Sequence, residues 1–370
     1  MRRIELFCLK QTTIGGMARV TLQTIADMVG VSRMTVSNAF SRPNQLSSDL
    51  RDRILAAADE LGYVGPDPSG RALARGTTGA VGVLLTDSLR DAFTNEVAAE
   101  FLGAIAAELA PTGLALTLLT SSAATDAVPA RDVPLDGALV YSCDETSTAV
   151  AWLERRRLPL VFVDQDSKPG VPSVNIDDRA GARAAAQHLI DLGHRRIGIA
   201  DSTVSGEAGL VDDPRAAVAS HVHRQRMLGW LDALDAAHIT PVVAQGLHSD
   251  VDKGEEPARL LLDRPAGERP TGIVCISDVV AYGVVQVARR LGLRVPDDVS
   301  VVGFDDSPLA SRMEPALTTV HQDVAAKGRA AATALTRAIE QSQGDAKPRA
   351  HHELLPTTLI VRASTGPAPL

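Results

Sequence analysis

The chain has 370 residues, of which 45% are hydrophobic and 22% charged, a composition typical of a folded protein with two or three domains. Only 3% of the residues are aromatic, so aliphatic side chains must build the cores. The sequence has no run of eighteen apolar residues and no signal peptide, which excludes a transmembrane helix and disfavours export. Cys8, Cys143 and Cys275 lie far apart, so neither disulfides nor a zinc site is expected. We therefore expect a cytoplasmic protein without a metal or a cofactor.

Charge is distributed unevenly along the chain. Residues 17–76 carry seven arginines and six acidic side chains, whereas the whole chain has a net charge of −8. A polyanion such as nucleic acid is therefore expected to bind the N-terminal segment through a few placed arginines. Residues 1–16, which precede Met17, have no clear periodicity, and we interpret them as a disordered extension. An arm that reaches a partner is the alternative.

Residues 21–61 have the apolar spacing of helices and lack the alternation of strands. Gly30 and the turn residues 41–44 interrupt the pattern, which predicts three short helices. Gly30 can end the first helix and Ser32 can cap the second, so the two form a helix-turn-helix. A Gly/Pro-rich segment follows at 62–70, and the Ala/Arg stretch after it is typical of a linker that can form one or two helical turns.

The predicted second helix carries side chains suited to reading DNA. Arg33, Met34 and Asn38 fall on its outer face, where a recognition helix meets base edges. Arg can pair with guanine through two hydrogen bonds, and Asn can do so with adenine. A plain helical hairpin with solvated charges is the alternative.

From Ala80 onward, short apolar runs alternate with amphipathic helical stretches, which predicts parallel sheets with right-handed crossovers. This periodicity is compatible with a barrel, one open sheet or two smaller sheets. The expected strands are 81–85, 114–119, 138–140, 160–163, 197–200, 242–244, 273–276 and 299–302. The expected helices are 95–109, 179–192, 224–237, 279–291 and 324–339.

The helix-turn-helix segment Val20–Phe40, with RILAAADELGY at 53–63, resembles the DNA-binding head of the lactose-repressor/galactose-repressor family of bacterial transcription regulators. The resemblance extends from Met17 to Gly366. The further motifs that carry it are RALARG at 71–76, DG at 136–137, HLIDLGH at 188–194, RMLG at 226–229, SD at 277–278, DDVSVVGFDD at 297–306, LTTV at 317–320 and LP at 355–356.

The resemblance implies which head residues contact DNA. Arg33, Met34 and Asn38 match base-reading positions, although relatives commonly have Arg where this chain has Asn38. Leu73 matches a leucine that wedges into the central minor groove and kinks the DNA. The implied phosphate contacts, each equally suited to be a cap or turn residue, are Thr21, Ser32, Thr35, Ser37 and Asn44.

The implied architecture is an all-α helix-turn-helix head plus an α/β effector-binding core of two doubly wound parallel-sheet subdomains, like that of periplasmic binding proteins. A ligand would lie in the cleft at the carboxyl ends of the strands. The expected boundaries are 17–65 for the head, 66–78 for the hinge, 79–176 with 309–318 for the N-subdomain, and 177–308 with 319–370 for the C-subdomain.

The same resemblance implies five effector-binding residues: Arg226, Asp278, Asp87, Phe93 and Asp177. In relatives, the positions of Arg226 and Asp278 hydrogen-bond ligand hydroxyls or carboxylates. A surface charge and a helix cap are the alternatives for these two residues, and Asp177 is equally consistent with a structural role at the crossover. Two departures concern the ligand: the segment 121–135 looks too short for the usual helix, and the loop 202–221 is unusually long.

These observations predict a ligand-responsive repressor that binds a palindromic operator as a homodimer, with a sugar or related polar metabolite as effector. The alternative is a sugar-binding protein or a sugar-processing enzyme on the same core. The sequence contains no GxSxG, HExxH or GxxxxGK[ST] motif, and the adjacent carboxylates Asp305 and Asp306 are poorly placed to act on one bond. We therefore expect no catalysis.

Overall fold

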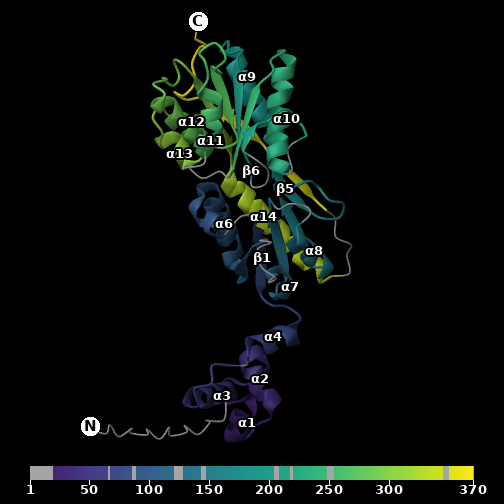
Figure 1. Cartoon of the computed structure of the whole chain (residues 1–370). Helices are drawn as coiled ribbons and strands as arrows, with labels where there is room; N and C mark the ends of the chain where they lie inside the picture. The colour runs from purple at the N-terminus through teal and green to yellow at the C-terminus, as the bar shows by residue number, and fades with distance from the viewer. Residues whose placement is uncertain are drawn as a thin grey trace, which may run out of the picture. The chain divides into compact units, whose positions relative to one another are not determined.

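A computed structural model describes residues 20–65, 67–85, 89–120, 128–142, 147–203, 208–216, 220–247, 254–344 and 350–369. The chain divides into two compact units, with the boundary between Thr78 and Gly79. Figure 1 shows that the first unit is helical and that the second is built from sheets and helices. No helix in the described part of the chain is long and apolar enough to cross a membrane.

The first unit consists of helices around a small aliphatic core. It contains α1 (Leu22–Val29), α2 (Arg33–Ser41), the 3-10 helix η1 (Pro43–Gln45), α3 (Ser48–Glu60) and α4 (Pro68–Arg75). Its buried side chains are Ile25, Ala26, Val36, Ala39, Ile54, Ala57 and Ala58. Gly30 ends α1 with a φ of 76°, a conformation that favours glycine, and its N–H donates to the carbonyl of Ala26. The expected helix-turn-helix is therefore confirmed.

The second unit contains two sheets, and each forms the centre of one lobe. All strand pairs of the first sheet are parallel, in the order β12-β5-β4-β3-β1-β2. Its strands are β1 (Ala80–Leu85), β2 (Ala115–Thr120), β3 (Gly137–Tyr141), β4 (Leu160–Val163), β5 (Ser173–Ile176) and β12 (His352–Leu355). This sheet and the helices that cover it form the first lobe.

The second sheet has the order β13-β11-β10-β9-β6-β8-β7, in which only the two edge strands run antiparallel to their neighbours. Its strands are β6 (Ile197–Thr203), β7 (Gly209–Leu210), β8 (Val242–Leu247), β9 (Gly272–Cys275), β10 (Ser300–Asp305), β11 (Thr318–Gln322) and β13 (Thr357–Ile360). This sheet and its helices form the second lobe. Two doubly wound lobes, the architecture that the resemblance implies, are therefore confirmed.

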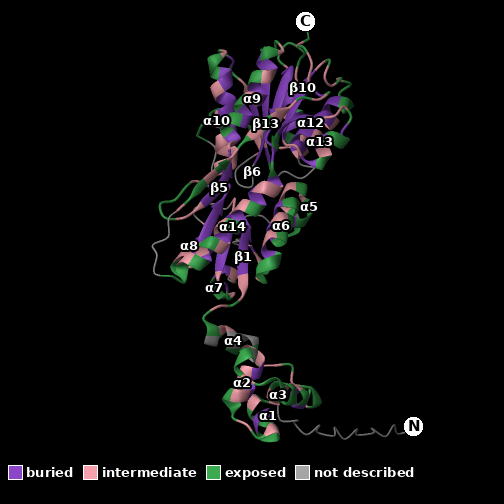
Figure 2. Cartoon of the chain, turned by 180° about the vertical axis from the view of Figure 1, so that it is seen from behind, coloured by how far each residue is buried: buried purple, intermediate pink, exposed green. Residues whose placement is uncertain are grey.

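Helices cover both sheets, and the strands between them are largely buried (Figure 2). The first lobe holds α5 (Leu89–Thr94), α6 (Glu96–Leu109), the 3-10 helix η2 (Ala110–Thr112), α7 (Pro129–Asp132), α8 (Thr148–Arg155) and α14 (Val324–Ser342). The second lobe holds α9 (Asp178–Asp191), α10 (His221–Ala236), α11 (Glu255–Leu262), α12 (Asp278–Arg290) and α13 (Pro308–Arg312).

The chain passes between the lobes three times, and two of the expected boundaries are wrong. The crossings lie between β5 and α9, between β11 and α14, and at Pro356 between β12 and β13. The segment 309–318 belongs to the second lobe, because Ala310 and Leu317 pack into the core around the second sheet. Residues 324–344 and 350–355 return to the first lobe, where α14 packs against α6 and β12 extends the first sheet.

Gly229 marks a close approach of two helices in the second lobe. A Cβ atom there would lie 2.3 Å from the carbonyl oxygen of Arg179 in α9 and 2.9 Å from the Cβ of Ala182. We expect Gly229→Ala to force α9 and α10 apart and to lower the free energy of unfolding by about 2 kcal/mol, as overpacking does. Urea denaturation measures this loss.

Gly103 in α6 provides the matched control, because a Cβ atom added there would have no other heavy atom within 4 Å outside its own helix backbone. Gly103→Ala replaces a poor helix former, so the free energy of unfolding should stay unchanged or rise by up to ~1 kcal/mol. Equal losses in the two variants would contradict the close approach at Gly229.

Candidate functional site

The N-terminal part of α2 presents a polar and apolar surface that the head does not use for packing. Arg33 and Met34 are exposed, with 71% of Met34 accessible, whereas Asn38 is half-buried. On the opposite side of α2, Val36 and Ala39 are buried in the head core. An exposed Met at this position has no role in the core, so this face is available for contact with a partner.

Two of the predicted phosphate contacts also cap helices. The Thr21 hydroxyl accepts a hydrogen bond from the Thr24 N–H in a capping box at α1, and the Ser32 hydroxyl accepts one from the Thr35 N–H at α2. Thr21 and Ser32 are exposed, Thr35 and Ser37 are half-buried, and Asn44 lies exposed in η1. The first turns of α1 and α2 are thereby fixed, whereas contact with phosphates remains a prediction for all five residues.

The hinge segment contains a short helix with an exposed leucine. α4 spans eight residues, and 86% of the Leu73 side chain is accessible. A leucine exposed to this extent contributes little to the stability of the unit that carries it. Its minor-groove role stays a prediction.

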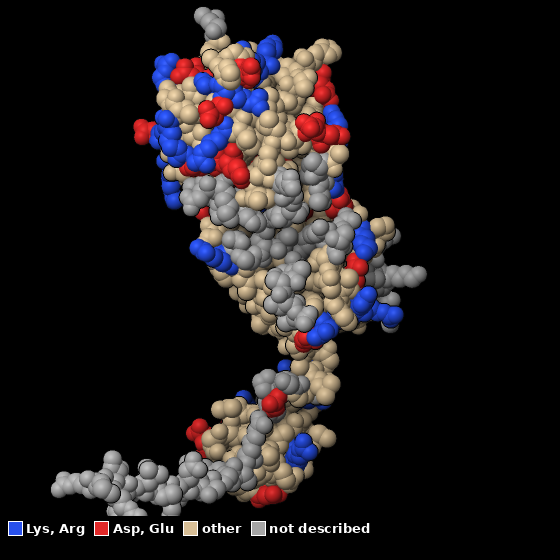
Figure 3. All heavy atoms as spheres, in the orientation of Figure 1, with Lys and Arg blue, Asp and Glu red and all other residues tan. Residues whose placement is uncertain are grey.

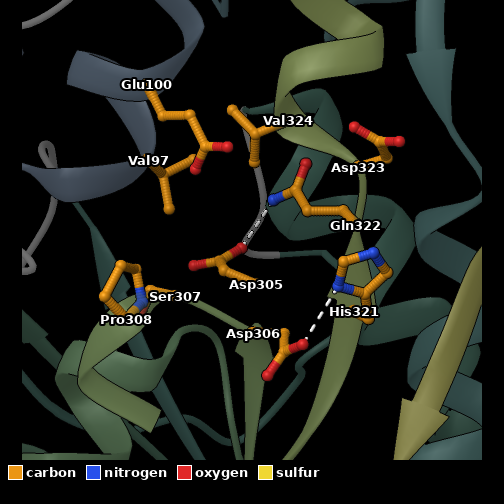
Figure 4. Close-up of a pocket in the computed structure, with 10 residues that line it drawn as sticks. All are labelled: Val97, Glu100, Asp305, Asp306, Ser307, Pro308, His321, Gln322, Asp323 and Val324. Carbon is orange, nitrogen blue, oxygen red and sulfur yellow. Dashed lines mark hydrogen bonds and ion pairs between the residues drawn. The ribbon is translucent and has the colours of Figure 1, made fainter. Parts of the chain in front are cut away.

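The second unit has a pocket at the carboxyl ends of β10 and β11, where Asp305 and His321 are paired in register. The residues that line it are Val97, Glu100, Asp305, Asp306, Ser307, Pro308, His321, Gln322, Asp323 and Val324. Figure 4 shows Asp305 in the middle of this group, facing Gln322, with Glu100 of α6 on the other side. Both lobes therefore contribute to the pocket.

Arg226 of α10 lies buried directly behind Asp305. Its Nε donates to Asp178 Oδ1 at 2.7 Å, its Nη1 donates to the Ile276 carbonyl at 2.5 Å, and Nη1 lies 3.3 Å from Asp305 Oδ1. The guanidinium stacks on the Phe304 ring at 3.5 Å from its centroid. Burial opposes ionisation of Arg226, but the charges of Asp178 and Asp305 outweigh it and raise its pKa. Arg226 is thus a charged, tightly held side chain.

A second buried cation, Lys327 of α14, continues this arrangement into the first lobe. Its Nζ donates to Asp164 Oδ2 at 2.6 Å and to Gln322 Oε1 at 2.9 Å, and only 1% of the residue is exposed. Gln322 in turn donates to Asp305 Oδ1 at 2.7 Å. Burial lowers the pKa of Lys327, but the nearby Asp164 more than compensates, so the pKa is raised. A continuous polar network therefore links the two lobes.

Asp278 is buried beside this network and is fully engaged by its own neighbours. Its Oδ2 accepts hydrogen bonds from the N–H of Ser307 at 2.7 Å and from its hydroxyl at 2.9 Å, and its Oδ1 accepts one from the Thr319 hydroxyl at 2.5 Å. Burial, followed by the charge of Asp305, raises the pKa of Asp278 to about 7. These contacts tie the start of α12 to the segment after β10 and to the start of β11.

The remaining predicted effector residues are Asp177, Phe93 and Asp87. Asp177 caps α9 by accepting a hydrogen bond from the Ala180 N–H at 3.0 Å. Phe93 is exposed on α5, with 67% of the residue accessible. Asp87 falls outside the described residues. Their contact with a ligand stays a prediction.

Comparison with known proteins places the chain in a family. Residues 21–66 match the bacterial regulatory proteins of the lacI family, and residues 186–365 match a periplasmic binding protein-like domain. An HTH-type transcriptional regulator of Mycolicibacterium smegmatis is 36% identical over 332 residues, which cover 85% of this chain and 89% of that protein. The chain belongs to the lacI family. It is a DNA-binding transcriptional regulator.

Solved structures of lacI-family members are similar over nearly the whole chain. The lac repressor dimer bound to operator and the anti-inducer ONPF is 26% identical, with a TM-score of 0.71 and coverage of 94% of this chain and 99% of that one. The complex of the transcriptional regulator CelR with cellobiose is 28% identical, with a TM-score of 0.67 and coverage of 94% and 100%.

Sequence reasoning missed several residues that this lacI-family core brings together. The buried Asp164, Asp178 and Lys327 and the half-buried Asp305 join Arg226 in one network, although they span more than 160 positions of the sequence. Asp164 directly follows the predicted strand 160–163, and this strand-end position is a signal that could have identified it. The sequence offers no such signal for Lys327, which lies inside an ordinary amphipathic helix.

The raised pKa of Asp278 predicts how the stability of this lacI-family core changes with pH. Because the folded state holds the proton up to about pH 7, it binds more protons than the unfolded state, whose carboxyl titrates near its usual value. The stability that Asp278 contributes is therefore full below about pH 4 and is lost as the pH rises towards 7.

Asp278→Asn removes this titration while it keeps the size of the side chain. On going from pH 5 to pH 8, we expect the variant to gain more than about 1 kcal/mol of unfolding free energy relative to the wild type, the equivalent of one pKa unit. Calorimetry at both pH values measures the difference, with the exposed Glu268→Gln as control. The same difference between Asp278→Asn and the wild type at both pH values would refute the prediction.

Proposed function

We propose that this lacI-family regulator is a repressor that binds a palindromic operator as a homodimer and responds to a small polar effector. The two-fold symmetry of a dimer matches two half-sites of a palindrome, with one head for each. The lac repressor, which is 26% identical, was solved as a dimer on its operator, and this supports the same assembly here. Because its DNA target lies in the bacterial cytoplasm, we place the protein there.

The exposed face of α2 is the observation that carries the DNA-binding part of the proposal. Arg33 and Met34 are accessible, while the same helix is held in the head core by Val36. We assign base reading to Arg33, Met34 and Asn38, with Leu73 as the minor-groove wedge. Thr21, Ser32, Thr35, Ser37 and Asn44 are assigned to phosphates, which set the register of the head on the duplex.

We place the effector at the pocket between the lobes, with Arg226 as the central residue of its site. Asp305 and Gln322 line the pocket and belong to the network of Arg226. We keep Asp87, Phe93, Asp177 and Asp278 as candidates, with Asp278 acting through its tie to Ser307. CelR was solved with cellobiose, which supports a sugar or a related metabolite as the effector class.

On the face that Figure 3 shows, the basic and acidic side chains of the described residues are interspersed over the second unit, so this described part of the face has no single-sign surface for a polyanion. DNA binding is therefore assigned to the head. A gel-shift titration with DNA that flanks the protein's own gene tests the proposal, with random DNA of the same length as control. Equal affinity for both DNAs would contradict sequence-specific binding.

Arg33→Ala should relax base choice at one step of each half-site. We expect a loss of roughly 1–3 kcal/mol on the operator, because one bidentate pair with a base is removed. Binding titrations against operators with single substitutions locate that step. The conservative Arg33→Lys keeps the charge but not the bidentate geometry, so it should recover only part of the loss.

Leu73→Ala should weaken operator binding and leave binding to random DNA nearly unchanged, because the wedge acts only in the kinked specific complex. Parallel titrations on the two DNAs separate the effects. Equal losses on both DNAs would show that Leu73 acts on the fold of the head or hinge instead.

We expect dimers in solution, because two heads related by a two-fold axis match the two half-sites of a palindrome. Light scattering at micromolar concentration measures the number of chains. A mass of four chains, or of one, would overturn this expectation.

A further inference from the structure

A short connection joins α4 to the second unit. The helix ends at Arg75 and the second unit begins at Gly79, so only residues 76–78 lie between them. Gly76 and Gly79 both have a left-handed backbone, with a φ of 72°. The Gly76 N–H donates to the Ala72 carbonyl at 2.8 Å, which ends α4. The connection is therefore held by a backbone hydrogen bond where it leaves the helix.

At its other end, the connection is held through Gly79. The Gly79 N–H donates to Asp136 Oδ2 at 2.8 Å, and the Gly79 carbonyl accepts a hydrogen bond from the Ala115 N–H at 2.8 Å. The Asp136 N–H in turn donates to the Ala80 carbonyl at 2.8 Å. Asp136 therefore holds both residues at which the chain enters β1, one through its backbone and one through its carboxylate.

A side chain is needed here because Gly79 lies outside the strand ladder. The pairing of β1 with β3 begins at Val81 and Gly137, so the Gly79 N–H precedes the first pair. A backbone N–H that is shielded from water needs a hydrogen-bond partner. The Asp136 carboxylate supplies this partner and extends the hydrogen bonding of the sheet to the first residue after the hinge segment.

The backbone beside Asp136 has little room to shift. A Cβ atom on the next residue, Gly137, would lie 3.0 Å from side-chain carbons of both Leu335 and Ile339 in α14. These two side chains are buried in the core of the first lobe. The Asp136 carboxylate is therefore attached to a fixed part of the lobe, and its hydrogen bond fixes Gly79 to the same part.

This contact bears on the wedge that we assign to Leu73. Leu73 lies six positions before Gly79, and consecutive Cα atoms are only 3.8 Å apart, so the position of Gly79 limits where the wedge can reach. Glycine adopts many backbone conformations when nothing restrains it. Without the Asp136 contact, the chain would leave the first lobe in several directions, and the specific complex would have to order it at a cost in conformational entropy.

We propose that Asp136 is a positioning residue for operator binding, whose carboxylate fixes the backbone of Gly79 and thereby the direction in which the hinge segment leaves the first lobe. The inference rests on the proposed function, and within it on the wedge role of Leu73. Binding to random DNA does not use the wedge, so the contact acts on the specific complex alone.

Substitution of the carboxylate in the full chain tests the proposal. Asp136→Ala should lower the affinity for the operator by about tenfold or more, as the loss of a hydrogen bond to a charged group does, and leave the affinity for random DNA nearly unchanged. Asp136→Asn keeps an oxygen that can accept from Gly79, so it should recover most of the loss. Gel-shift titrations measure both DNAs, and urea denaturation verifies the fold of each variant.

Asp132→Asn is the matched control. Asp132 is an exposed carboxylate of α7, four positions before Asp136, and its hydrogen bonds go to the Arg131 side chain. The control should therefore keep full affinity for the operator. A fluorescent dye at each end of the operator adds a second measurement, because a misplaced wedge should give a less strongly bent complex for Asp136→Ala than for the control.

An insertion separates positioning from a general effect on stability. Two glycines inserted between Thr77 and Thr78 lengthen the connection while Asp136 and Gly79 stay unchanged. The insertion should weaken operator binding on its own, and its combination with Asp136→Ala should add little further loss, because both changes act on the same connection.

Three results would overturn the proposal: unchanged operator affinity of Asp136→Ala, equal losses on operator and random DNA, or losses from the insertion and from Asp136→Ala that add in full. In each case the wild-type protein still distinguishes the operator from random DNA on the same preparation. A wild-type protein that binds both DNAs equally would instead refute the proposed function itself.

Discussion

The arrangement at the junction of the lobes depends on the burial of one guanidinium. Arg226 is 5% exposed, and it reaches Asp178, the Ile276 carbonyl and Asp305 from a single position on α10. A buried charge is tolerated only when opposite charges and hydrogen bonds compensate it, and removal of one partner is strongly destabilising. The start of α9 and the ends of β9 and β10 are therefore held at fixed distances from α10. The carboxyl end of β10 is one of the two strand ends at which the pocket forms.

Among the described residues, Arg226 forms no ion pair with the first lobe and is connected to it through other side chains. Gln322, the last residue of β11, donates to Asp305 and accepts from Lys327, which lies beyond the crossing in α14. Lys327 then holds Asp164 at the end of β4. The network therefore follows the crossing of the chain between the lobes that lies between β11 and α14. A movement of either lobe changes the hydrogen bonds of a buried charge, so such movements are coupled to the state of the pocket.

Elements that depend on neighbouring residues could be predicted from the sequence, whereas contacts between distant segments could not. The head could be predicted, because Gly30, Ser32 and the helical spacing act within a few residues. The apolar runs likewise predicted eight strands, but β5, β7, β11, β12 and β13 were missed. In β5 and β11, buried polar residues such as Asn175 and Thr319 interrupt the apolar pattern. The lobe that holds α14 was assigned wrongly, because an amphipathic helix does not encode which sheet it covers. Pairs such as Lys327 with Asp164 become visible only once the fold brings distant segments together.

The contribution of both lobes to the pocket bears on how a ligand can change the affinity for DNA. A ligand shifts an equilibrium only through its different affinities for the two states, and a tenfold difference corresponds to about 1.4 kcal/mol. A ligand that contacts one lobe alone would bind equally well in every arrangement of the lobes and would have no effect. The pocket is lined from both lobes, by Glu100 of α6 and by Asp305 of β10. A ligand that contacts both lobes therefore binds most tightly in one arrangement of the lobes and favours that arrangement.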